Sequence, residues 1–144
     1  MSFMADSIKL KSLKEPKEES DGLRVLIARY RPRYLPKHKE NWDEWWKDLA
    51  PSRELWKEYI KDKRIEWPEY ARRFVLEIRN NPKAVNALQT LATLVNTDID
   101  ELEKEKKDYH LATKHRVVTL LCHCRDERHC HRSILKEMIL EFTK

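Results

Sequence analysis

Glycine is almost absent from this chain: Gly22 is the only glycine among 144 residues, whereas an average protein has about 7%. Walker loops and dinucleotide-binding loops need several closely spaced glycines, because their backbones approach the phosphate groups closely. The sequence therefore excludes both kinds of glycine-rich phosphate loop.

Long apolar runs are also absent. No stretch approaches the roughly 18 apolar residues needed to cross a bilayer, and the start of the chain lacks the charged and apolar regions of a secretory signal. We therefore expect a cytoplasmic protein with no membrane partner. We also expect a flexible segment at 1–6 followed by a single domain at 7–144. The sequence leaves the oligomeric state open.

Cysteine is scarce, and its three copies lie close together, at Cys122, Cys124 and Cys130. An odd number of cysteines cannot pair completely, and a reducing compartment keeps thiols free. This grouping favours metal binding, catalysis or simple packing over structural disulfides. The formal net charge of +5, from 30 basic and 25 acidic residues, mildly favours anionic partners.

The apolar pattern predicts an α/β fold: one domain with a small, mostly parallel sheet covered by several helices. Strands are expected at 7–13, 23–30 and 116–122, and the last two are expected to pair in parallel. The charged stretch at 98–110 is expected to be solvated.

Five helices are expected from apolar residues that recur every three or four positions. Their stripes are Trp42, Trp45, Trp46 and Leu49; Leu55, Trp56, Tyr59 and Ile60; Tyr70, Phe74 and Ile78; Val85, Leu88, Leu91, Ala92 and Val95; and Ile134, Leu135, Met138, Ile139 and Phe142. Ser52 is expected to cap the second helix, and Asn81 followed by Pro82 to start the fourth.

The cysteines fall where a strand ends and a helix begins. Ligands of open α/β sheets bind beyond the carboxyl ends of the strands, and the first turn of a helix favours anions. One hypothesis is an anion or thiolate site with Arg125, Arg128 and Arg132 as ligands, because cations stabilise a thiolate. Cys122 and Arg128 have the C-x5-R spacing of phosphatase and rhodanese loops, although the intervening residues are bulky.

Other hypotheses remain open for the same segment. Cys122, Cys124 and Cys130, with His129 or His131, could form a Cys3His zinc site. The cysteines could instead pack in the core, or act as redox-sensing thiols.

A basic loop earlier in the chain raises a compatible hypothesis. The stretch ARYRPRY, residues 28–34, interleaves three arginines with two tyrosines. Arginine binds phosphate and tyrosine stacks on bases, so this loop could bind nucleic acid. In the alternative, Tyr30 ends a core strand and the arginines pair with nearby acids.

Two segments together resemble a known family. The first, residues 20–60, has an Asp-Gly pair before a strand, then arginine, Pro-Arg, an acidic and aromatic segment and a Leu-Ala-Pro-Ser motif. Those positions are Asp21, Gly22, Arg29, Pro32, Arg33, Asp43, Trp45, Leu49, Ala50, Pro51 and Ser52. The second is VTLLCHCRDERHCHRSILKEMI, with Cys122, Asp126, His129, Cys130, His131 and Arg132.

On these motifs the chain resembles the domain of unknown function 488 family, in its YeaO-like branch, over nearly its whole length. The resemblance implies the α/β fold and suggests that Arg29 and Arg33 converge with the Cys-His-Arg segment. It does not imply a reaction. The chain departs from the family pattern at Arg31, where tryptophan is usual, at Tyr34, where glycine is usual, and at Cys124, where glutamate is common.

We therefore expect a pocket where the loops after strands 23–30 and 116–122 meet. Arg29, Arg33 and Arg132 would hold an anionic ligand, such as a phosphate, a nucleotide or nucleic acid. Cys122 would be the thiolate, His131 its proton acceptor or orienting group, and Asp126 would orient an arginine or cap the helix.

The alternative is a non-catalytic binding module with a structural zinc ion held by Cys122, Cys124, Cys130 and His131. The sequence does not decide whether the protein is an enzyme, and it identifies no cofactor beyond this candidate zinc.

Overall fold

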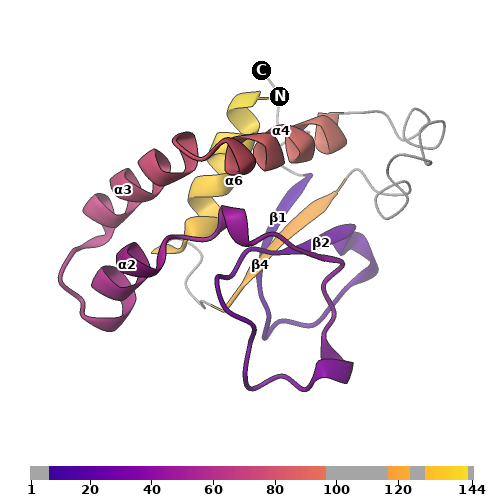
Figure 1. The fold of residues 1–144 in the computed structure, drawn as a ribbon. Coiled ribbons are helices and arrows are strands. Elements are labelled where there is room, and N and C mark those ends of the chain that lie inside the picture. Colours follow the sequence, from indigo (N-terminus) through magenta and orange to yellow (C-terminus); the bar gives the residue numbers. More distant parts are fainter. Residues whose placement is uncertain (1–6, 97–116, 124–128, 143–144) are drawn as a thin grey trace.

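The computed structural model describes residues 7–96, 117–123 and 129–142. The described strands form a four-stranded sheet in the order β1-β4-β2-β3, and every neighbouring pair is parallel. Figure 1 labels three of them, β1, β4 and β2. The strands are β1 (Ile8–Ser12), β2 (Leu23–Leu26), β3 (Glu44–Trp45) and β4 (Val118–Cys122). Val118 pairs with Ile8 on one side and with Leu23 on the other, so β4 is a central strand.

Three long helices gather on one side of the sheet: α3 (Trp67–Arg79), α4 (Pro82–Asn96) and α6 (His131–Phe142) (Figure 1). Both α4 and α6 contact β4, while the short α2 (Arg53–Trp56) packs against α3. A π-helical segment, η4 (Lys57–Lys61), continues α2. Short 3-10 turns lie at η1 (Glu19–Asp21), η2 (Lys37–Lys39) and η3 (Lys47–Leu49). The α/β fold with a small parallel sheet is thus confirmed.

Alternation along the strands gives the sheet two different faces. Leu23, Val25, Val118 and Leu120 belong to the main core under the helices. On the opposite face Leu26 and Leu121 form a smaller cluster with Leu13 and Ala28, against which Trp42 and Trp45 pack. The buried strand expected at 116–122 is confirmed over Val118–Cys122, where every residue of β4 is buried; Val117 precedes the strand, and residue 116 lies outside the described residues.

The sheet face that carries the smaller cluster also buries charged side chains. Asp21 is fully buried and receives Lys9 Nζ at 2.8 Å and Lys11 Nζ at 3.0 Å, and it pairs with the buried guanidinium of Arg24. Thr119 Oγ1 donates to the Asp21 carbonyl at 2.6 Å. Burial alone would raise the pKa of Asp21, but hydrogen bonds from Lys9, from the backbone of Glu18 and from Lys11 hold it well below its usual range.

The single glycine sits at the entry to β2 for a steric reason. Gly22 has φ of +63°, and a Cβ there would lie 2.1 Å from the carbonyl oxygen of Val117. The Leu23 N–H donates to that same oxygen at 2.9 Å. Only glycine lets the chain approach β4 closely enough to start this pairing.

The helix predicted from Asn41 through Leu49 is wrong. This segment contains the edge strand β3, whose flanking residues Asp43 and Trp46 donate backbone N–H groups to Arg24 and Leu26 at 2.8 and 2.9 Å. Trp45 and Trp46 pack in different clusters, as successive strand residues do. Tryptophan suits strands, and pairing with β2 outweighs the helical spacing of the three tryptophans.

The other predicted elements are present with adjusted limits. The strand expected at 23–30 ends at Leu26. Ser52 caps α2, where its Oγ accepts from Leu55 N at 3.1 Å, and Asn81 Oδ1 accepts from Lys83 N at 3.1 Å ahead of Pro82. Two stripe positions predicted to be buried, Ile60 and Phe142, are exposed instead, because each lies at the end of its helix.

Parts of the predictions fall outside the described residues. These are the segment at 1–6 and the charged stretch at 98–110. Among the helices that are described, none combines the length and the apolar character needed to cross a membrane.

Candidate functional site

A cavity of about 850 Å³ lies at the carboxyl ends of β2 and β4. One wall is the loop after β2, from Ala28 to Arg33. The second wall comes from α2 and η4, and the base is formed by Cys122, Cys130 and His131. Because β2 and β4 pair in parallel, their carboxyl ends meet at one edge of the sheet, which is a favoured position for ligands.

Basic residues outnumber acidic residues in the cavity lining. Its basic residues are Arg29, Arg31, Arg33, Arg53, Lys57 and Lys61, and its only acidic lining residue among those described is Glu54. Arg31 pairs with Glu40, and Arg29 Nη1 lies 3.5 Å from the carbonyl oxygen of Pro51. The excess of positive charge favours an anionic ligand.

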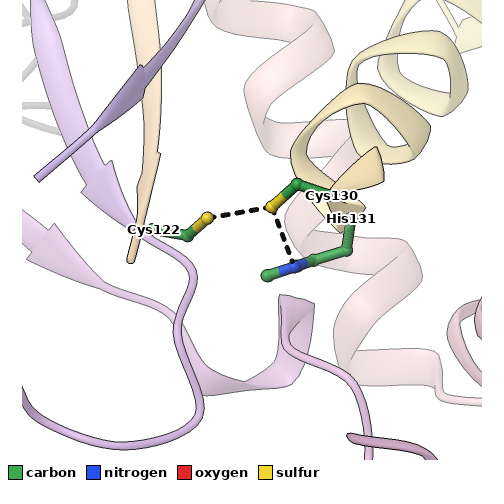
Figure 2. Close-up of side chains that lie close together, drawn as sticks. All are labelled: Cys122, Cys130 and His131. Carbon is green, nitrogen blue, oxygen red and sulfur yellow. Dashed lines mark hydrogen bonds between the residues drawn. The ribbon is translucent and has the colours of Figure 1, made fainter. Parts of the chain in front are cut away.

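Two thiols and an imidazole meet at the base of the cavity. Figure 2 shows Cys122 reaching from the end of β4 toward Cys130, which precedes the first turn of α6. The two Sγ atoms are 2.9 Å apart, and Cys130 Sγ lies 3.6 Å from His131 Nδ1. The three side chains offer ligand atoms that all lie within 4.8 Å of one another, and all three residues are buried.

The orientation of the His131 ring assigns a hydrogen to one of its two nitrogens. Its Nε2 lies 2.7 Å from the carbonyl oxygen of Ile27, which can only accept, so Nε2 carries a hydrogen. In the neutral ring, Nδ1 then carries a lone pair, and this lone pair is directed at Cys130. His131 thus joins the end of β2 to the thiol pair and is placed to accept a thiol proton.

Aromatic rings complete the cavity walls. Tyr30 meets Trp56 edge-on at 6.1 Å between ring centroids, and Tyr59 stacks on Tyr70 at 4.2 Å. Beside the cavity, Tyr34 meets His123 at 6.1 Å. Partial burial raises the pKa of Tyr34 above its ordinary value, and a thiolate at Cys122 would raise it further. The walls therefore combine flat rings with positive charge.

The structure brings together some of the residues predicted for the site. Arg29 and Arg33 line the same cavity as Cys122 and His131. Arg132 is 1% exposed in the first turn of α6 and is not among the lining residues described. Four candidate residues lie outside the described part of the chain: Cys124, Arg125, Asp126 and Arg128.

Sequence reasoning missed the wall formed by α2 and η4. Arg53, Lys57 and Lys61 recur every four residues, which places them on one face of a helix. That spacing was the available signal. The wall is held by α3, because Glu77 accepts a hydrogen bond from the Ser52 backbone N–H at 2.9 Å and another from the Ser52 hydroxyl. The Leu-Ala-Pro-Ser motif thus fixes the start of the basic wall.

Similarity to known proteins identifies the family of this chain. A family model described as "Active DUF488-N3 subclade" matches residues 8–143. The chain is also similar to "Uncharacterized protein YeaO" of Escherichia coli (strain K12), with 29% identity over 86 residues, or 60% of this chain and 74% of that protein. No solved structure matches. Since the family model spans nearly all of the chain, the protein belongs to the DUF488 family, in its N3 subclade.

Proposed function

We propose that this protein binds an anionic ligand of the phosphate, nucleotide or nucleic-acid class in its cavity, and uses a cysteine thiolate at the cavity base. The observation that carries the proposal is the meeting of six basic side chains with a buried Cys-Cys-His cluster in one cavity. The description of its subclade as active supports a reaction centre without specifying the reaction.

The shape of the lining supports a ligand of moderate size. A volume of about 850 Å³ exceeds what a single phosphate fills and lies within the usual range of about 300–1,000 Å³ for small-molecule sites. Exposed Arg33 and Arg53 can reach a charged group, while Tyr30 and Trp56 offer flat apolar surface. Within the proposed class, this combination favours a nucleotide over a bare phosphate.

The thiol pair supports a reactive sulfur. A thiolate at Cys130 would lie at the start of α6, where the helix dipole favours negative charge. His131 Nδ1 would accept its proton, and the thiol of Cys122 would donate to the resulting anion across 2.9 Å. Cys122 is the alternative nucleophile, since the two sulfurs can share one proton between them.

The binding part of the proposal is tested by calorimetric titration of adenosine triphosphate and of inorganic pyrophosphate, without added metal, at low ionic strength. We expect saturable binding that Arg33→Gln weakens about tenfold, because a hydrogen bond to a charged group contributes about 1.5–3 kcal/mol. Arg72→Gln is the matched control: it removes the same charge from an exposed ion pair with Glu69, outside the cavity lining. Equal weakening by both variants, or no binding to the wild type, would reject the proposal.

A second candidate function is a binding module with a zinc ion. It is favoured by the three ligand atoms of Cys122, Cys130 and His131, a donor set that suits zinc. The fit is incomplete, because tetrahedral Zn–S bonds of about 2.3 Å hold two sulfurs about 3.8 Å apart, whereas these lie at 2.9 Å. The metal content of the purified protein distinguishes the zinc module from the thiolate site. If the protein contains about one zinc per chain, and if Cys122→Ser and Cys130→Ser each lose it, the zinc module would replace the thiolate proposal.

A further inference from the structure

We propose that Cys122 and Cys130 form a reversible disulfide, which makes the base of the cavity a redox-active dithiol site. This goes beyond the anion site, since it rests on the positions of two sulfur atoms and requires no anionic ligand. Both thiols are reduced in the structure.

The geometry favours a bond between these two sulfurs. A disulfide requires about 2.0 Å between sulfur atoms, so Sγ atoms at 2.9 Å need to approach by only about 1 Å. They are carried by different elements, the end of β4 and the start of α6, and they point toward each other (Figure 2). The two sulfur atoms are therefore already close to bonding distance in the reduced fold.

Burial selects the class of oxidant. Cys122 and Cys130 are 1% and 2% exposed, yet both line the cavity, so only a small part of each thiol meets the open space. A bulky disulfide such as oxidised glutathione needs room for in-line attack on its sulfur. A hydroperoxide needs room for two oxygen atoms only, and we assign hydrogen peroxide or a small organic hydroperoxide as the oxidant.

The reaction then has two balanced steps. A thiolate attacks one peroxide oxygen, the O–O bond breaks, and protonation of the leaving oxygen yields water and a sulfenic acid. The second thiol attacks that sulfur, the S–O bond breaks and a second water leaves. Two thiols lose two hydrogens and two electrons, and one hydrogen peroxide becomes two waters. The two thiols return when a dithiol small enough to enter the cavity, such as dithiothreitol, attacks one sulfur and is itself oxidised to a disulfide.

Tryptic digestion can identify which two cysteines form the disulfide. Trypsin cleaves after Arg116, Arg125, Arg128 and Arg132, so Cys122 and Cys130 fall in different peptides, 117–125 and 129–132. Cys124 lies in the same peptide as Cys122. Cys124→Ser therefore leaves one pairing that can link the two peptides.

The test treats the reduced, folded Cys124→Ser chain with one equivalent of hydrogen peroxide, blocks the remaining thiols and analyses the intact protein and its tryptic peptides by mass spectrometry. We expect the chain to lose the mass of two hydrogen atoms and the two peptides to be linked, with both changes reversed by dithiothreitol. Cys130→Ser in the same background should instead gain the mass of oxygen atoms and give no link.

Two results would overturn the proposal. One is oxygen addition to both cysteines of the Cys124→Ser chain with no linked peptide. The other is linkage that forms only in urea, which would show that the folded chain holds the sulfurs apart. Titration of pyrophosphate into the reduced wild type is measured separately, so failure of the dithiol does not count as failure of the anion site.

Discussion

At the scale of single residues, the most demanding position is Asp21. A fully buried carboxylate costs free energy unless it is paired, and here two lysines and one arginine surround it. Because the pKa of Asp21 is lowered on folding, the carboxylate adds stability at neutral pH. That contribution is fully present above the ordinary pKa of a carboxyl group, and it is lost as pH falls from that value through the lowered pKa of the folded state.

We predict that Asp21→Asn lowers the free energy of unfolding by about 3–5 kcal/mol near neutral pH, because it leaves Arg24 and Lys11 buried without their carboxylate. The deficit should shrink as pH falls below the ordinary pKa of a carboxyl group, because the unfolded wild-type chain then binds a proton at Asp21 that the folded chain does not. Urea unfolding of both chains between about pH 7 and pH 3 measures this. As a control, Glu58→Gln breaks a half-exposed ion pair with Arg73 and should cost less than about 1 kcal/mol. A deficit for Asp21→Asn that stays constant with pH would contradict the assignment.

At the scale of elements, the site depends on how two short segments are held. The basic wall begins at Ser52, whose hydroxyl caps α2 and also donates to Glu77 of α3. The base depends on His131, which bonds the Ile27 carbonyl at the end of β2. Each contact joins segments far apart in the sequence, and each places a cavity side chain.

We predict that Ser52→Ala destabilises the fold by about 1–2 kcal/mol, because the cap of α2 and the bond to Glu77 are lost together. It should also weaken pyrophosphate binding, since Arg53 and Lys57 follow directly on this cap. Thermal unfolding and calorimetric titration measure the two effects. Thr90→Ala removes a hydroxyl that donates only within α4, to the Asn86 carbonyl among the interactions described, and should change neither quantity noticeably. Unchanged stability of Ser52→Ala would show that the cap and the Glu77 contact contribute little.

The error at residues 41–49 also belongs to this scale. Three tryptophans at helical spacing favoured a helix, but the segment lies beside β2, whose edge offers backbone groups that need partners. The spacing of apolar residues shows the periodicity of a segment, but it does not show which strand will lie beside that segment in the fold. The strand β4 and helices α3 and α4 were predictable because their apolar patterns are long and unambiguous.

At the scale of the whole molecule, the chain places positive charge and sulfur chemistry at one edge of the sheet. The strands predicted at 23–30 and 116–122 were expected to pair in parallel, as β2 and β4 do. A pocket at their carboxyl ends was therefore predictable in outline. The contribution of α2 and η4 was predictable only in part: the spacing of Arg53, Lys57 and Lys61 indicates a basic helix face, but nothing in residues 53–61 indicates which loop that face will meet. The proximity of Cys122 and Cys130 likewise depends on how α6 packs against β4.

The anion site and the reactive sulfur are proposed to share one cavity. The most direct measurement is the rate at which iodoacetamide alkylates the native, reduced protein, with the modified cysteine identified by peptide mass, in the presence and absence of pyrophosphate at matched ionic strength. We expect Cys122 or Cys130 to react without unfolding, and we expect saturating pyrophosphate to slow the reaction several-fold. If both thiols react only after unfolding, or if bound pyrophosphate leaves the rate unchanged, the shared site is contradicted.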